Sequence, residues 1–148
     1  MATSFLQSTW SGRLRVLVLD TNALLWLVAG NLSLGPVAKA EIESGLAEAE
    51  ICVSAISFWE VAMASDRGRV TIHADVVPWR NMILRLGINE LPITGEIAIT
   101  AARLPDFHGD PADRLITATA HANSATLVTA DRRILQWRSL LRRIDARR

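Results

Sequence analysis

The chain of 148 residues contains one cysteine, Cys52, one lysine, Lys39, and no tyrosine. A single cysteine excludes an internal disulfide framework and a zinc site made of several cysteines. No apolar run reaches the roughly 18 to 20 residues of a membrane-spanning helix, because Asp20 and Asn22 interrupt the longest candidate. Residues 1–13 lack the charged start and the apolar core of a signal peptide. We therefore expect a cytoplasmic protein without a membrane segment.

An excess of charge of either sign is also missing, since the formal net charge is +1. Seven arginines nevertheless lie between Arg132 and Arg148, and Asp145 is the one acid that follows Asp131. Arginine forks match phosphate geometry, and clustered arginine is typical of phosphate binding. A solvated helix face explains the cluster equally well. The small net charge is thus the sum of separate acidic and basic clusters, and it does not exclude a nucleic-acid ligand.

Short apolar strands alternate with helices along the chain, which is typical of an α/β fold around a mostly parallel sheet of about four or five strands. The length suits one domain over residues 14–148. We expect residues 1–13 to form an N-terminal extension without fixed structure. The predicted strands are 14–19, 51–54, 88–91, 125–128 and 140–144, and the predicted helices are 21–29, 36–49, 55–66, 75–86, 94–104, 111–122 and 131–136.

Four acids follow the predicted strands or open the predicted helices, namely Asp20, Glu60, Asp113 and Asp131. Parallel strands place their carboxyl ends at one edge of the sheet, where ligands bind in such folds. Carboxylates that share a cleft repel each other and need a cation to stay ionised together, and Mg²⁺ and Mn²⁺ prefer oxygen ligands. Helix capping or the helix dipole explains each acid equally well when it is taken alone.

Polar residues beside these acids could orient metal ligands or water, or could serve ordinary turns and caps. They are Thr21, Asn22, Ser57 and Thr129. Ser57 and Glu60 also fit a capping box, although both lie inside a predicted helix. Asp110 precedes a proline, which is typical of a helix cap, but it lies three residues before Asp113 and could face the same cleft.

Other chemistries have weaker support in the sequence. His73, His108 and His121 have no carboxylate and nucleophile pattern around them, and we interpret them as incidental. His108 is the exception, because it lies beside a motif and could touch a substrate. No G-x-G-x-x-G or Walker pattern is present, which argues against nucleotide-cofactor chemistry.

Four segments together carry a resemblance to a known family: VLDTNALLW at 18–26, SAISFWEVA at 54–62, HGDPADRLI at 108–116 and LVTAD at 127–131. In order and spacing they resemble the PIN-domain ribonucleases, most closely the toxins of VapBC-type toxin–antitoxin pairs. The resemblance implies a three-layer α/β/α fold. It also implies an acidic quartet at Asp20, Glu60, Asp113 and Asp131, with Asp110 as the competitor for the third position.

The activity that this resemblance implies is an endoribonuclease that depends on Mg²⁺, or on Mn²⁺ as a substitute, and cleaves RNA with metal-activated water. A homodimer and a cognate antitoxin are the implied partners. The alternative is a catalytically inactive PIN-like scaffold that binds RNA or an antitoxin, and the intact set of acids argues against it. A third alternative is a nuclease for structured DNA, but the chain looks too short for the extra helical arch of such an enzyme.

Overall fold

The computed structural model describes residues 15–48 and 50–148, so the predicted extension at 1–13 lies outside the described residues. Five strands form one parallel sheet in the order β3-β2-β1-β4-β5. The strands are β1 (Val16–Leu19), β2 (Glu50–Ser54), β3 (Ile88–Leu91), β4 (Thr126–Thr129) and β5 (Arg143–Asp145). The prediction of an α/β fold with a mostly parallel sheet is therefore confirmed.

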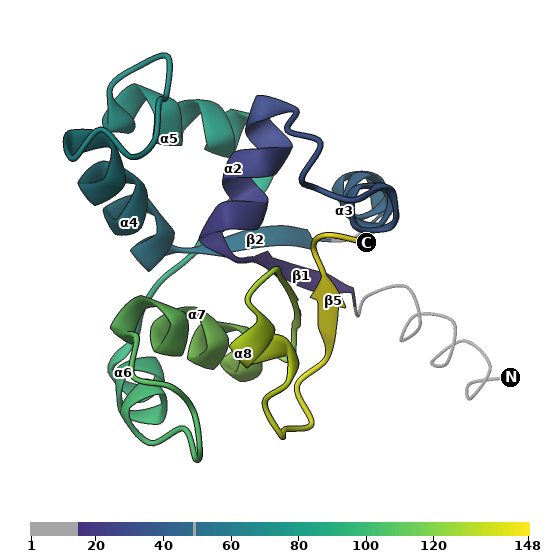
Figure 1. Ribbon diagram of the computed structural model, residues 1–148, viewed down its shortest axis with the longest axis vertical. Coiled ribbons are helices and arrows are strands. Elements are labelled where there is room, and N and C mark those ends of the chain that lie inside the picture. Colours follow the sequence, from purple (N-terminus) through teal and green to yellow (C-terminus); the bar gives the residue numbers. More distant parts are fainter. Residues whose placement is uncertain (1–14, 49) are drawn as a thin grey trace, which may run out of the picture.

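Seven helices in the described part of the chain cover the two faces of this sheet. Helices α2, α3, α4 and α5 lie on one face, and α6, α7 and α8 lie on the other (Figure 1). Their bounds are α2 (Thr21–Ala29), α3 (Pro36–Glu48), α4 (Ala55–Asp66), α5 (Val76–Arg85), α6 (Gly95–Ala102), α7 (Pro111–Ala122) and α8 (Arg132–Leu135). The arrangement is the three-layer α/β/α fold that the resemblance implies, and no described helix has the length and apolarity to cross a membrane.

Alternation along the central strand divides the core between the two faces. Leu17 and Leu19 of β1 pack into the cluster beneath α2 to α5, whereas Val18 packs into the cluster above α7. All three side chains are at most 2% exposed. A parallel strand covered on both faces is apolar throughout, which is why β1 is an unbroken apolar run in the sequence.

The fifth strand differs from its prediction. It begins at Arg143 instead of Leu140, because Leu140 is fully exposed and lies outside the sheet. Arg143–Asp145 pairs with residues 127–129 on one side only. An edge strand tolerates half-buried polar side chains, so the apolar pair Leu140 and Leu141 was a poor guide to it.

The C-terminal segment lies against the start of α3. Gly35 donates its backbone N–H to Ala146 (2.9 Å), and Ala38 donates to the carbonyl of Arg148 (2.9 Å). A Cβ atom at position 35 would lie 2.2 Å from that carbonyl oxygen, so only glycine fits this close approach. The contact brings Arg147 over the ring of Trp26, at 5.3 Å, and to the rim of the pocket at the carboxyl ends of the strands.

Candidate active site

The order of the strands reverses between β1 and β4, because the chain proceeds from β1 outward to β3 and then returns to the other side of β1. Ligands bind beyond the carboxyl ends of parallel strands at such a switch point. A pocket of about 280 Å³ lies there. We call it the acidic pocket, after the carboxylates in its lining, Asp20, Glu60, Asp113 and Asp131.

Asp20 is fixed at the switch point by the neighbouring strand β4. Its backbone N–H donates to Val128 (2.9 Å), and the hydroxyl of Thr129 donates to its Oδ2 (2.7 Å). The other oxygen caps α2 by accepting the backbone N–H of Thr21 (2.8 Å). Burial raises the pKa of Asp20 to about 6, opposed by the Thr129 hydrogen bond and supported by the charge of Asp113.

Glu60 reaches the same pocket from α4. The hydroxyl of Thr21 donates to its Oε1 (2.5 Å), and the same hydroxyl lies 2.9 Å from that of Ser57, which is fully buried. Burial raises the pKa of Glu60 to about 7, opposed by this hydrogen bond and supported by the charge of Asp20. The capping-box interpretation of Ser57 is wrong, because α4 begins at Ala55 and its cap is Ser54.

The two candidates for the third acid have different places. Asp110 is exposed and caps α7, since its Oδ1 accepts the backbone N–H of Asp113 (2.9 Å). Asp113 is half-buried and lines the acidic pocket. Its Oδ2 lies 2.7 Å from Nε2 of His108. Burial raises the pKa of Asp113, and the hydrogen bond to His108 opposes this shift.

Asp131 is the one acid of the quartet whose pKa is lowered. Burial acts against this shift, but the hydrogen bonds and the charge of Arg133 outweigh it. The guanidinium of Arg133 lies 3.2 Å from Asp131 and 3.7 Å from Asp113. Asp131 therefore stays ionised at lower pH than the other three acids of the pocket.

The segment before α7 is held from inside by Arg114. Its guanidinium donates to the carbonyls of Phe107 (2.7 Å), His108 (2.9 Å) and Ala101 (2.9 Å). The ring of His108 stacks on that of Phe107, with 4.4 Å between the ring centres. Arg114 thus fixes the loop that carries His108 to the helix that carries Asp113.

The donors of the pocket suit a hard divalent cation. Each carboxylate oxygen has two lone pairs, so the hydrogen bonds to Asp20 and Glu60 leave acceptor sites free. Ligand atoms of His108, Asp113 and Asp131 lie within 4.8 Å of one another. Three acids of one pocket have a raised pKa, chiefly because of burial, and a bound cation would let them ionise together. These features fit Mg²⁺ or Mn²⁺.

The structure brings most of the expected residues together and adds three side chains that were not among the predicted acids and their polar neighbours. Asn22 is exposed at the rim, whereas Thr21, Ser57 and Thr129 are buried beneath the acids. The added residues are His108, Arg133 and Arg147. A signal existed for His108, which opens the motif at 108–116. The other two were visible only as members of the arginine cluster.

The chain is similar to known proteins. The model of a family described as PIN domain matches residues 17–138. Ribonuclease VapC22 of Mycobacterium tuberculosis (strain ATCC 25618 / H37Rv) is 36% identical over 122 residues, which cover 82% of this chain and 91% of that protein. The family match includes the positions of all four acids.

Two solved structures are similar in fold. VapBC2 from Rickettsia felis, bound to a DNA fragment from its promoter, matches with a TM-score of 0.65 and 15% identity, covering 87% of this chain and 97% of that one. A toxin-antitoxin complex from Klebsiella pneumoniae matches with a TM-score of 0.55 and 24% identity, covering 77% of this chain and 85% of that one. At these identities the likeness concerns the fold alone.

Proposed function

The chain belongs to the PIN-domain family, and on that premise we propose that it is a VapC-type ribonuclease, the toxin of a toxin–antitoxin pair. We further propose that Asp20, Glu60, Asp113 and Asp131 hold Mg²⁺, or Mn²⁺ in its place, and that the reaction is endonucleolytic cleavage of RNA. The 36% identity to a ribonuclease supports the activity. The arrangement of the acids supports the mechanism.

One observation carries this proposal. Four acids from four separate parts of the chain line one pocket of about 280 Å³, although each could have been satisfied as a simple helix cap. Three of them have a raised pKa, chiefly because of burial. Stability alone does not favour such a group of like charges, whereas a cation site requires it.

The residues of the pocket have distinct roles in the proposed reaction. A bound divalent cation would supply Lewis-acid polarisation of the scissile phosphate and a more acidic water. Thr129 donates a hydrogen bond to one oxygen of Asp20 and Thr21 to one oxygen of Glu60, which fixes the two carboxylates that would hold the cation. Arg133 keeps Asp131 ionised, and its exposed guanidinium is placed to meet a phosphate oxygen.

We propose two protein partners. The similarity of fold to a toxin-antitoxin complex supports a cognate antitoxin. A homodimer is supported by large apolar side chains left exposed on two helices of one face, since Trp59 of α4 is 56% exposed and Val77 of α5 is 66% exposed. Sedimentation velocity of the purified chain measures the dimer directly.

The test of the proposed activity is cleavage of total RNA by the purified protein with Mg²⁺, with Mn²⁺ or with EDTA, beside the variant Asp20→Asn. Asparagine keeps the helix cap and the volume but removes the charge. We expect cleavage with either metal, none in EDTA, and none above background for Asp20→Asn.

Two results would contradict the proposal. Cleavage that persists in EDTA or in Asp20→Asn would exclude the metal mechanism. No cleavage of any RNA in a broad panel, with Mn²⁺ still bound in a calorimetric titration, would favour the inactive scaffold that binds RNA or an antitoxin.

A further inference from the structure

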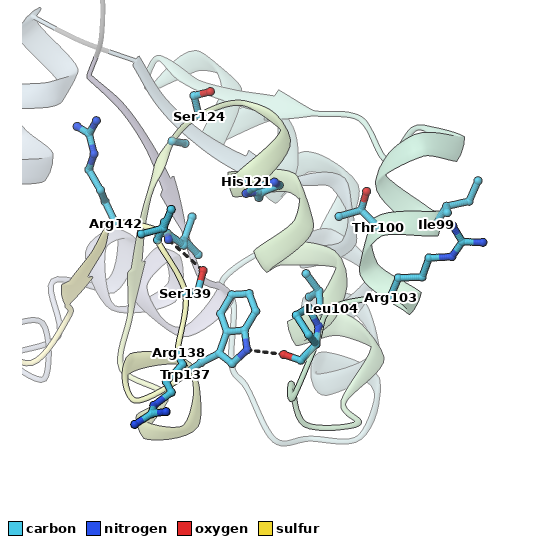
Figure 2. Close-up of a pocket in the computed structure, with 14 residues that line it drawn as sticks. Ile99, Thr100, Arg103, Leu104, His121, Ser124, Trp137, Arg138, Ser139 and Arg142 are labelled. Carbon is cyan, nitrogen blue, oxygen red and sulfur yellow. Dashed lines mark hydrogen bonds between the residues drawn. The ribbon is translucent and has the colours of Figure 1, made fainter.

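A second and larger pocket, of about 690 Å³, lies on the face covered by α6 and α7. Its walls are the end of α6, the end of α7 and the segment 137–142 that leads into β5 (Figure 2). We call it the basic pocket, because Arg103, Arg138, Arg142 and His121 line it. No aspartate or glutamate is among the described residues of its lining.

The three arginines of the basic pocket are exposed and lie on different sides of it (Figure 2). Within residues 15–48 and 50–148, none of their guanidinium groups has a hydrogen bond or an ion pair. By contrast, Arg143 is committed to the protein, since it donates to the carbonyls of Ile134 (2.8 Å) and Trp137 (2.5 Å). Arg143 thus shapes the segment, and the other three remain available to a ligand.

The floor of this pocket is apolar. Leu104 and Leu141 are each 9% exposed, and Trp137 packs against the cluster that contains them. The indole N–H of Trp137 donates to the carbonyl of Pro105 (2.8 Å), and its ring meets Phe107 edge-on at 5.0 Å. A pocket that combines a held aromatic ring with exposed arginines around it has the features that bind single-stranded nucleic acid, through base stacking and phosphate contacts.

The basic pocket adjoins the acidic pocket through one short segment. Leu104 and Pro105 line the basic pocket, and His108 contacts Asp113 in the acidic pocket. Three residue steps separate Pro105 from His108, and three steps span at most roughly 11 Å. A strand of a few nucleotides is therefore long enough to lie in both pockets.

The opposite charges of the two pockets explain why their proximity would help to bind RNA. A polyanion that enters the acidic pocket meets the charge of Asp131 and its neighbours, which repels phosphate wherever a cation does not balance it. Arginines a short distance along the same segment supply the compensating attraction. An acidic peptide has the same charge, but none of the described residues that line the basic pocket belongs to a strand that such a peptide could extend.

We propose that the basic pocket binds a single-stranded stretch of RNA next to the phosphodiester that is cleaved, with phosphates on Arg138 and Arg142 and a base against Trp137. This inference rests on the proposed ribonuclease function and deepens it. It assigns to the arginine cluster a substrate-binding role separate from the acids.

The experiment measures the affinity of a short fluorescein-labelled RNA of mixed sequence by anisotropy, over a series of KCl concentrations without divalent metal. All proteins carry Asp20→Asn, so the RNA stays intact. The test variant adds Arg138→Ser and Arg142→Ser. The control adds Lys39→Ser and Arg85→Ser, which remove the same charge from exposed positions on α3 and α5, outside both pockets.

Each phosphate contact on a single strand adds about 0.7 to the slope of log affinity against log salt. Loss of two contacts should therefore lower the slope by about 1.4 and weaken binding roughly 25-fold at 0.1 M salt, whereas the control should change affinity by less than about twofold. Equal behaviour of the two variants would overturn the proposal.

Two further outcomes would also overturn it. If a fluorescein-labelled oligoglutamate binds in an Arg138- and Arg142-dependent way and the RNA does not, the pocket is a protein site. If the test variant changes the sedimentation mass instead of RNA affinity, a second copy of the chain covers the pocket.

The failure of this inference is distinguishable from failure of the proposed function. The same two substitutions, Arg138→Ser and Arg142→Ser, are also tested with Asp20 restored. If RNA cleavage is unaffected by them, the ribonuclease function stands and the proposed role of the basic pocket is contradicted. RNA binding that depends on the two arginines, without any cleavage, would support the basic pocket and contradict the ribonuclease function.

Discussion

The acidic and basic pockets adjoin the same segment, 104–108, but they hold their charges in opposite ways. The acids are buried or half-buried, and each accepts a hydrogen bond from a named partner. The arginines Arg103, Arg138 and Arg142 are exposed and have no such partner in the described part of the chain. The carboxylates of the acidic pocket are thus held in place before any ligand binds, whereas the arginines of the basic pocket are not.

This difference follows from what each pocket would bind. A divalent cation has strict distances and few ligands, so its oxygens have to be oriented in advance. The backbone of a single-stranded RNA is flexible and varied, and long exposed arginines follow it without a fixed geometry. Acids held together in a pocket raise the free energy of the folded state, whereas exposed arginines change it little.

The largest expected effect comes from removing the Arg114 side chain, which holds the segment that both pockets share. We expect Arg114→Met to lower the free energy of unfolding by about 3 to 4 kcal/mol, because the carbonyls of Ala101, Phe107 and His108 lose their charged donor. Urea unfolding followed by circular dichroism measures this.

Arg114→Lys is the matched control for that change. Lysine keeps the charge but lacks the planar fork, so it should recover only part of the loss. Full recovery by lysine would mean that charge, and not the three-carbonyl geometry, holds the segment.

A smaller effect tests whether ionisation of the buried acids destabilises the folded protein. Asp20 has a pKa of about 6 in the folded protein and an ordinary value of 3.8 when unfolded. As pH rises from 4 to 7 the unfolded chain therefore releases this proton first, and the free energy of unfolding falls. For Asp20 alone the loss is about 2 kcal/mol between pH 4.5 and pH 8.

Urea unfolding in EDTA at these two pH values checks the prediction. The difference between the two pH values should shrink in Asp20→Asn, which keeps the cap but cannot ionise. Glu60 acts in the same direction, with a folded pKa of about 7, and Mn²⁺ at pH 8 should restore stability to the wild type. If the free energy of unfolding changed equally with pH in both proteins, ionisation of Asp20 would not destabilise the folded state.

The smallest of the three effects concerns His108, which touches Asp113. We expect His108→Ala to weaken Mn²⁺ binding about tenfold, since partners that orient a ligand contribute at least that much to metal affinity. Isothermal titration calorimetry measures the change. His73→Ala, at an exposed position, should leave the affinity unchanged. Unaltered Mn²⁺ affinity in His108→Ala would show that Asp113 needs no positioning.

Most of the fold was predictable from the sequence for a definite reason. Strands covered on both faces are largely apolar runs, so β1 and β2 were evident from the stretches 14–19 and 51–54, close to their observed bounds. Helix starts were predicted one residue early at Asp75, Thr94 and Asp131, because these residues cap the helices without belonging to them. The edge strand β5 lacked an apolar pattern.

The site was predictable where it depends on topology and not where it depends on loops. The carboxyl ends of parallel strands meet at one edge, which predicted that Asp20 and Asp131 would lie close together. The position of His108 depends on a loop whose shape is set by Arg114, and no local pattern reveals that. The basic pocket joins segments about forty residues apart, so only the folded chain reveals it.

The hydrogen bond between Thr129 and Asp20 spans 109 positions of the sequence. During synthesis, the strand that carries Asp20 is made first, and Thr129 follows 109 positions later. A chain still short of residue 126 has neither Thr129 nor Asp131 and cannot assemble the acidic pocket. For a protein proposed to cut RNA, the four acids can therefore come together only after β4 and Asp131 have been synthesised.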